Sequence, residues 1–319
     1  MPVEAPSLLE IRQARARIAR DIVHTPLVRL GVDGPAEIYL KLENLQPIGS
    51  FKLRGATNAM AQASDDQLAR GVYTASAGNM AQGVAWCARA RGIPCSVVVP
   101  DTAPDTKLAA ITRLGAAIHK VPFPEWWDVL VTRRHPRFEG QLFIHPVSDR
   151  AVIAGNGTIG LELAEQLPGA NAVIVPYGGG GLSTGIAAAL RELSPATKIY
   201  AAEVETAAPL APSLAAGSPQ EIVYTPSFVD GIGSKGLLAE MWPIVRDLLA
   251  GSFVMSLEAI ADAIRVLVER NRVVAEGAGA APVAAALAGK AGTGKIVCVV
   301  SGGNIDRAKL VKILNGQLP

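Results

Sequence analysis

The segment Ser50-Phe51-Lys52-Leu53-Arg54-Gly55-Ala56 is the one around which the chain is organised. It follows a strand-like run at residues 38–42 and a polar turn at 43–49, so we expect Lys52 where a loop enters a helix. A helix start carries free N–H groups and the positive end of the helix dipole, which penalise an ammonium. A lysine held there tends to lose its proton, and a neutral amine is a nucleophile that forms Schiff bases. The alternative for a lone lysine, a solvated surface residue, is the commoner case.

Around this segment the chain alternates between strand-like and helix-like stretches. The expected strands are residues 71–75, 95–100, 117–121, 172–176, 198–204 and 296–300, and the expected helices include 8–22, 56–62, 80–91, 106–114, 158–167, 182–193, 257–270, 279–288 and 308–314. Solid runs of β-branched residues between helices are typical of a parallel sheet covered on both faces. Residues 209–227, rich in Pro, Ala, Ser and Gly, are the least regular stretch. The pattern predicts an α/β protein.

The composition is that of an ordered protein with a large core. Half of the 319 residues are hydrophobic, 18% are charged and the net charge is +2. Because no block of like charges appears, we expect no nucleic-acid partner. The most apolar run, residues 278–288, is too short to span a bilayer, and the N-terminal helix does not resemble a signal peptide. Three scattered cysteines without metal-ligand spacing indicate free thiols, so a cytoplasmic protein is expected.

Four consecutive glycines, Gly178, Gly179, Gly180 and Gly181, follow an expected buried strand and open an expected helix. Such a loop exposes backbone N–H groups at a helix N-terminus, where a phosphate binds readily. Glycines let the backbone approach the anion closely. The alternative is a tight strand–helix turn without a ligand, which is common in α/β units.

Three other motifs in the chain resemble known sites but fail in detail. The dinucleotide-binding pattern fails because Ser183 or Thr184 stands where its third glycine should be. Residues 181–185 match the nucleophile elbow of α/β-hydrolases around Ser183, but all four histidines precede that serine, so this function stays a remote alternative. Residues 289–295 resemble a P-loop, but Ile296 follows where Ser or Thr is needed.

The fifteen residues from Leu42 to Ala56 closely resemble the lysine segment of the pyridoxal-phosphate enzymes of the threonine/serine dehydratase and serine racemase family. The resemblance implies fold type II, a two-domain, open-sheet α/β fold like that of the tryptophan synthase β chain, with the cofactor in the interdomain cleft. It implies a large domain of residues 1–50 and 150–319, and a smaller inserted domain of residues 51–149. A homodimer is also implied.

The same resemblance assigns site residues. Lys52 would bind pyridoxal 5'-phosphate beside Phe51, and the four glycines with Leu182 would hold its phosphate. The remaining residues that the resemblance places around the cofactor and substrate are Asn79 at the ring hydroxyl, Ser301 at the pyridine nitrogen, Glu276 near the ring, and Ser76, Ala77, Gly78 and Met80 at the substrate. A serine at the nitrogen protonates it less than an aspartate would, which suits elimination.

The implied reaction is α,β-elimination of a β-hydroxy amino acid such as L-threonine or L-serine, giving a 2-oxo acid and ammonia, with Lys52 as general base. The rival reaction is racemisation of serine or aspartate. Ala77 stands where the racemases carry a serine, which favours dehydration. No metal is predicted, because Pro209 replaces the acid that would accompany Glu203. Met80 and Ile48 depart from the family pattern beside the substrate, which leaves the substrate open. A catalytically inactive small-molecule-binding protein is a further alternative.

Overall fold

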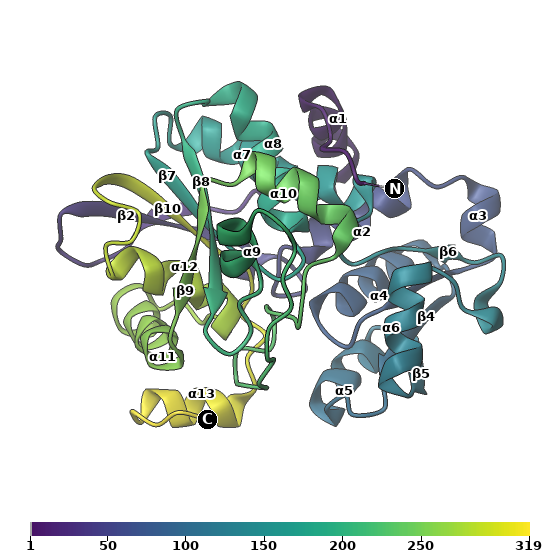
Figure 1. Cartoon of the computed structure of the whole chain (residues 1–319). Helices are drawn as coiled ribbons and strands as arrows, with labels where there is room; N and C mark the ends of the chain where they lie inside the picture. The colour runs from purple at the N-terminus through teal and green to yellow at the C-terminus, as the bar shows by residue number, and fades with distance from the viewer. Residues whose placement is uncertain (1) are drawn as a thin grey trace.

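The computed structural model describes residues 2–319 and contains two separate sheets, each flanked by helices (Figure 1). The larger sheet has the strand order β1-β2-β10-β7-β8-β9 and the smaller one β5-β4-β3-β6. Strand β1 pairs antiparallel with β2 at one edge, and every other pairing among the described strands is parallel. The prediction of an α/β fold with parallel sheets is confirmed.

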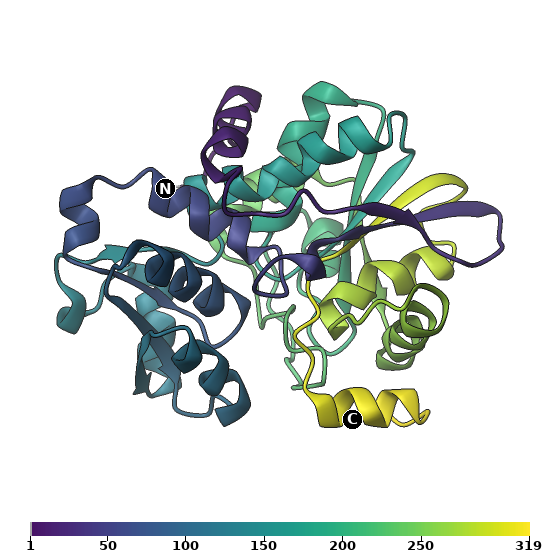
Figure 2. The same cartoon turned by 180° about the vertical axis from the view of Figure 1, so that it is seen from behind.

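The strands of the large sheet come from both ends of the chain. They are β1 (Leu27–Arg29), β2 (Ala36–Leu42), β7 (Ala172–Pro176), β8 (Lys198–Val204), β9 (Gly251–Met255) and β10 (Gly294–Val300). Figure 2 shows β2 beside β10, which places an early and a late part of the chain side by side. The strands of the small sheet are β3 (Val72–Ala75), β4 (Cys95–Pro100), β5 (Ala117–Val121) and β6 (Leu142–Phe143).

The helices around the large sheet are α1 (Leu8–Ile18), α7 (Arg150–Gln166), α8 (Gly181–Leu193), α9 (Leu210–Ala216), α10 (Trp242–Leu248), α11 (Leu257–Val266), α12 (Gly277–Leu287) and α13 (Arg307–Leu314). Those of the small sheet region are α2 (Lys52–Ala61), α3 (Asp65–Ala69), α4 (Asn79–Arg91), α5 (Asp105–Arg113) and α6 (Phe123–Thr132). Short 3₁₀ turns lie at Glu43–Leu45, Pro136–Phe138 and Ala239–Met241, and a π-turn at Leu267–Asn271 extends α11.

The central strands of the large sheet are buried on both faces because their side chains alternate between two cores. Ile174 and Cys298 pack into the core beneath α11 and α12. Their neighbours Val173 and Val297 face the opposite core, beneath α8 and α10. This alternation is the reason the strands appear in the sequence as continuous apolar runs.

Three parts of the large-sheet region differ from the sequence-based expectation. Residues 209–227, expected to be irregular, contain α9. Helix α10 and strand β9 were not anticipated. Helix α7 begins at Arg150 instead of Thr158, because Asp149 caps it by accepting hydrogen bonds from the backbone of Ala151 and Val152. None of the helices in residues 2–319 has the length and apolar character needed to cross a bilayer.

Candidate active site

Lys52 is the first residue of α2 and lies partly buried between the two sheets. Its Nζ donates a hydrogen bond of 2.6 Å to the carbonyl oxygen of Pro146 and lies 5.1 Å from the ring centre of Phe51. Burial lowers the pKa of the Lys52 amine to about 8, and the nearby Glu276 opposes this shift. Desolvation therefore makes the neutral amine accessible near neutral pH.

The four-glycine loop connects β7 to α8. The backbone N–H groups of residues 178–183 donate to no acceptor among residues 2–319, so six consecutive donors at a helix start are free. Free N–H groups at the positive end of a helix dipole attract anions. Gly180 has φ +96°, a conformation that favours glycine.

Val147 places the glycine loop next to the lysine. A Cβ on Gly179 would lie 2.5 Å from Val147 Cγ1, and a Cβ on Gly181 would lie 2.5 Å from the Val147 carbonyl oxygen. Val147 directly follows Pro146, whose carbonyl accepts from Lys52. One dipeptide thus touches both the lysine amine and the anion-attracting loop.

Asn79, at the start of α4, joins the small-sheet region to the large one. Its Nδ2 donates to Glu276 Oε1 at 2.8 Å, and its Oδ1 accepts from Asn304 Nδ2 at the same distance. Glu276 is 8% exposed. Burial raises the pKa of Glu276 to about 7; Asp230 adds to this shift, and the bond from Asn79 opposes it. Asn304 was not predicted as a site residue, although it stands in the same turn as Ser301.

Ser301 follows β10 and is nearly fully buried. Its backbone carbonyl accepts a hydrogen bond of 2.9 Å from the N–H of Phe51, the residue before the lysine. The next residue, Gly302, pairs with Ser50, and a Cβ on Gly302 would lie 2.6 Å from Glu276 Oε1. Ser301, Glu276 and the lysine segment are therefore neighbours, and a side chain at position 302 would require the Glu276 carboxylate to shift.

Not every predicted site residue exposes its side chain. Ser76, Ala77 and Gly78 are partly exposed in the turn before α4. Met80 is 1% exposed and packs into the hydrophobic core of the small sheet. Leu182 likewise packs into the core beneath α8. For these two residues only the backbone is available to a ligand.

Ser183 does not have the surroundings of a hydrolase nucleophile. It is fully buried, and its Oγ donates to the Gly180 carbonyl oxygen at 3.0 Å. Within residues 2–319 no histidine hydrogen-bonds to it. The remote alternative of an α/β-hydrolase is therefore wrong.

Glu203 uses its carboxylate to cap a helix. One oxygen accepts from the N–H of Leu210 at 2.8 Å, and the other from the N–H of Ala211 at 2.9 Å and from Ser252 Oγ at 2.6 Å. Burial raises the pKa of this carboxyl. In the part of the chain that the structure describes, no group of three or more His, Cys, Asp or Glu side chains is arranged to hold a metal ion.

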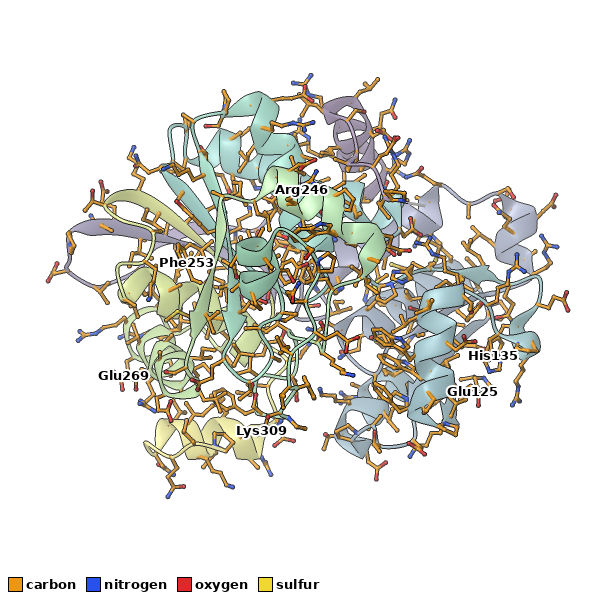
Figure 3. The ribbon with its side chains drawn as sticks, in the orientation of Figure 1. Glu125, His135, Arg246, Phe253, Glu269 and Lys309 are labelled. Carbon is orange, nitrogen blue, oxygen red and sulfur yellow. The ribbon has the colours of Figure 1, made fainter. Side chains whose placement is uncertain are left out.

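Three partly exposed charges bridge the two regions of the molecule. Asp230, in the loop after α9, accepts from Lys107 of α5 at 3.1 Å and from Lys309 of α13 at 3.0 Å. Figure 3 shows Lys309 on the side of α13 that faces α5. We call Lys107, Asp230 and Lys309 the bridging charges. They hold α5 of the small-sheet region near α13 of the large one.

Comparison with known proteins identifies relatives along nearly the whole chain. Residues 18–302 match the family described as pyridoxal-phosphate dependent enzyme. An L-threonine ammonia-lyase of Thermotoga maritima is 40% identical over 319 residues, covering 98% of this chain and 79% of that protein. A serine racemase of Oryza sativa subsp. indica is 36% identical, covering 95% of this chain and 92% of that protein. The solved structure of maize serine racemase superposes with a TM-score of 0.87 at 35% identity, covering 98% of each chain.

Proposed function

Because this chain belongs to the pyridoxal-phosphate dependent enzyme family and has its type II fold, we propose that it is a lyase that eliminates water from a β-hydroxy amino acid. The substrate class is that of L-threonine and L-serine, and the products are a 2-oxo acid and ammonia. The L-threonine ammonia-lyase similarity supports this reaction. The observation that carries the proposal is a buried lysine of lowered pKa beside a run of free backbone N–H groups.

The residues present suit pyridoxal phosphate. The glycine loop offers N–H donors with the right charge for a phosphate, and glycine leaves the backbone uncovered. Lys52 provides an amine that can be neutral near pH 8, as a Schiff base requires. We assign the phosphate to Gly178, Gly179, Gly180, Gly181 and Leu182, the ring to Asn79, Glu276 and Ser301, and the aldehyde to Lys52 beside Phe51.

When bound, pyridoxal phosphate supplies an electron sink for charge at the α-carbon of an amino acid. The protein's own part is to bind, orient and move a proton. The turn at Ser76, Ala77 and Gly78 would bind the substrate carboxylate, with the backbone of Met80 behind it. In this turn the Ser76 N–H donates to the Val98 carbonyl oxygen and the Gly78 N–H to Ser76 Oγ. Lys52 would take the α-proton, because burial lowers the pKa of its amine to about 8 and so makes the neutral base available.

Racemisation is the second candidate, since serine racemases are among the relatives. A racemase needs a proton donor on the face opposite the lysine. Ala77 has no proton to supply at the position where the resemblance places that donor. We therefore place elimination first.

Three further assignments belong to the proposal. Residues 51–149 would form a small domain and residues 1–50 and 150–319 a large one, as the separate sheets support. The enzyme would act in the cytoplasm. It would be a homodimer, an assignment that rests on the family resemblance and that sedimentation of the purified protein would test.

The test measures 2-oxo acid from L-threonine, L-serine, 3-hydroxyaspartate and phenylserine, with chiral analysis of the remaining substrate. Lys52→Ala should lose both the visible band of the lysine-bound cofactor and the activity. Lys120→Ala removes an exposed lysine of the small-sheet region and serves as the matched control. Product formation by Lys52→Ala at the wild-type rate would refute the assignment, and D-serine without 2-oxo acid would favour the racemase.

A further inference from the structure

Four charged side chains form a fully buried cluster beneath the start of α2. They are Lys41 of β2, Glu43 of the following 3₁₀ turn, Arg54 of α2 and Glu162 of α7, each at most 2% exposed. Two positive and two negative charges balance one another. We call this group the buried ion cluster.

Arg54 uses its whole guanidinium in the cluster. Nε and one terminal nitrogen bind the two oxygens of Glu43, each at 2.8 Å. The other terminal nitrogen binds Glu162 at 2.6 Å and Thr158 at 3.0 Å. A bidentate pair of this kind fixes orientation as well as distance.

The remaining members of the cluster are also fully paired. Lys41 donates to Glu162, to Gln166 at 2.9 Å and to the Thr25 carbonyl at 2.8 Å. Glu43 additionally accepts from Thr25 at 2.6 Å. A buried polar network in which every member is satisfied holds one geometry, whereas an unpaired member is costly.

Next to the buried ion cluster, the backbone of α2 also lies in close contact with α7. A Cβ on Gly155 would lie 2.5 Å from the Arg54 carbonyl oxygen, and one on Gly55 would lie 2.7 Å from Val152 Cγ1. Phe51, the N-cap of α2, makes no side-chain capping bond. The first turn of α2 is therefore anchored by Arg54 and this close contact instead of by a cap.

We propose that Arg54 is a positioning residue that aims Lys52 at the Pro146 carbonyl and the glycine loop. Residues two apart on a helix point about 200° apart, so they face opposite sides. Arg54 points towards α7 and the 3₁₀ turn at Glu43, and Lys52 consequently points towards Pro146. This inference rests on the proposed function, because Lys52 is taken there to bind the cofactor.

Two double variants, each removing one positive and one negative charge, separate positioning from stability. Arg54→Met with Glu43→Gln removes the side-chain ion pairs that anchor the first turn of α2, but keeps the pair of Lys41 and Glu162. Lys41→Met with Glu162→Gln keeps Arg54 on Glu43. Both should lower the unfolding temperature, but only the first should redirect Lys52.

The readout is the rate at which the cofactor-free, full-length chain forms an imine with pyridoxal phosphate at each pH, with borohydride reduction and peptide mapping to locate the adduct. The wild-type amine should titrate near 8, against an ordinary value of 10.5. In the Arg54 double variant the apparent pKa should rise by about one unit, and cofactor affinity should fall roughly tenfold. Glu276 and His145, the other titratable groups near Lys52, are unchanged in both variants.

The proposal is overturned if the folded Arg54 double variant keeps the wild-type profile and affinity, or if both double variants shift equally. Should the Arg54 double variant fail to fold, Arg54→Lys is used in its place, because it keeps the positive charge but loses the bidentate pair with Glu43. A folded Arg54→Lys protein should show a smaller shift of the same sign, and an unchanged profile would overturn the proposal. If the wild-type chain forms no adduct at Lys52, the proposed function itself fails.

Discussion

The buried ion cluster and the bridging charges differ in almost every physical respect. The cluster members are at most 2% exposed and saturate one another's hydrogen bonds. The bridging charges Lys107, Asp230 and Lys309 are 30–36% exposed and meet through single contacts. Solvent screens the second group and hardly reaches the first. The cluster can therefore fix a helix, whereas the bridge holds the two regions together only weakly.

The largest expected effect comes from breaking the cluster. Glu162→Ala leaves the buried charge of Lys41 without its carboxylate partner and leaves Arg54 with Glu43 alone. We expect the free energy of unfolding to fall by about 3–5 kcal/mol, measured by urea denaturation. Glu165→Ala, on the same helix but in an exposed pair with Arg15, should cost less than about 1 kcal/mol. Equal effects of the two changes would contradict the contrast between buried and exposed charges.

Glu276 is an intermediate case, because it is buried but bonded only to a neutral amide. Its pKa is raised from 4.5 to about 7 in the folded protein, so folding favours the protonated carboxyl. Its contribution to stability is full below pH 4.5 and is lost as the pH rises through 7. The wild type should lose up to about 3 kcal/mol relative to Glu276→Gln over this range. Urea denaturation at pH 4.5 and 7.5 would check this, and parallel curves for the two proteins would exclude it.

The smallest effect is expected at the bridge. Asp230→Asn removes the partner of Lys107 and Lys309 and should lower the free energy of unfolding by less than about 1 kcal/mol. Salt of about 0.5 M should abolish the difference from the wild type. The same salt should leave most of the Glu162→Ala effect in place. A bridge effect that survives salt would show that these charges are more desolvated than their exposure indicates.

Local sequence features predicted a large part of this molecule. Apolar runs predicted the central strands. The four glycines, with the strand before them and the helix after them, predicted the loop between β7 and α8. Gly92 ends α4 in the left-handed conformation, as its position indicated. Lys52 begins α2, as the turn before it predicted.

Features that depend on distant partners were not accessible from the sequence. Helix α9 starts where the Glu203 carboxylate of β8 accepts hydrogen bonds from the first N–H groups of the helix. Pro209 and the small residues that follow it do not predict this contact. The glycines of α7 argue against a helix locally, yet Gly155 is required where α2 crosses. Arg54 belongs to the segment at residues 50–56, but its partner Glu162 lies 108 residues away, so their ion pair could not be predicted from the local sequence.

The dipeptide Pro146-Val147 has a consequence for how mutations combine. Its first carbonyl receives the lysine amine, and its second residue fills the space that side chains at Gly179 and Gly181 would need. A side chain added to the glycine loop would therefore push on Val147, and through the adjoining Pro146 on the hydrogen bond of the Lys52 amine. Free-energy changes from Gly179→Ala and from substitutions at Val147 should not add, because both act on one shared contact. Through such thermodynamic coupling, the glycine loop and the segment that contacts Lys52 respond together to a substitution in either one.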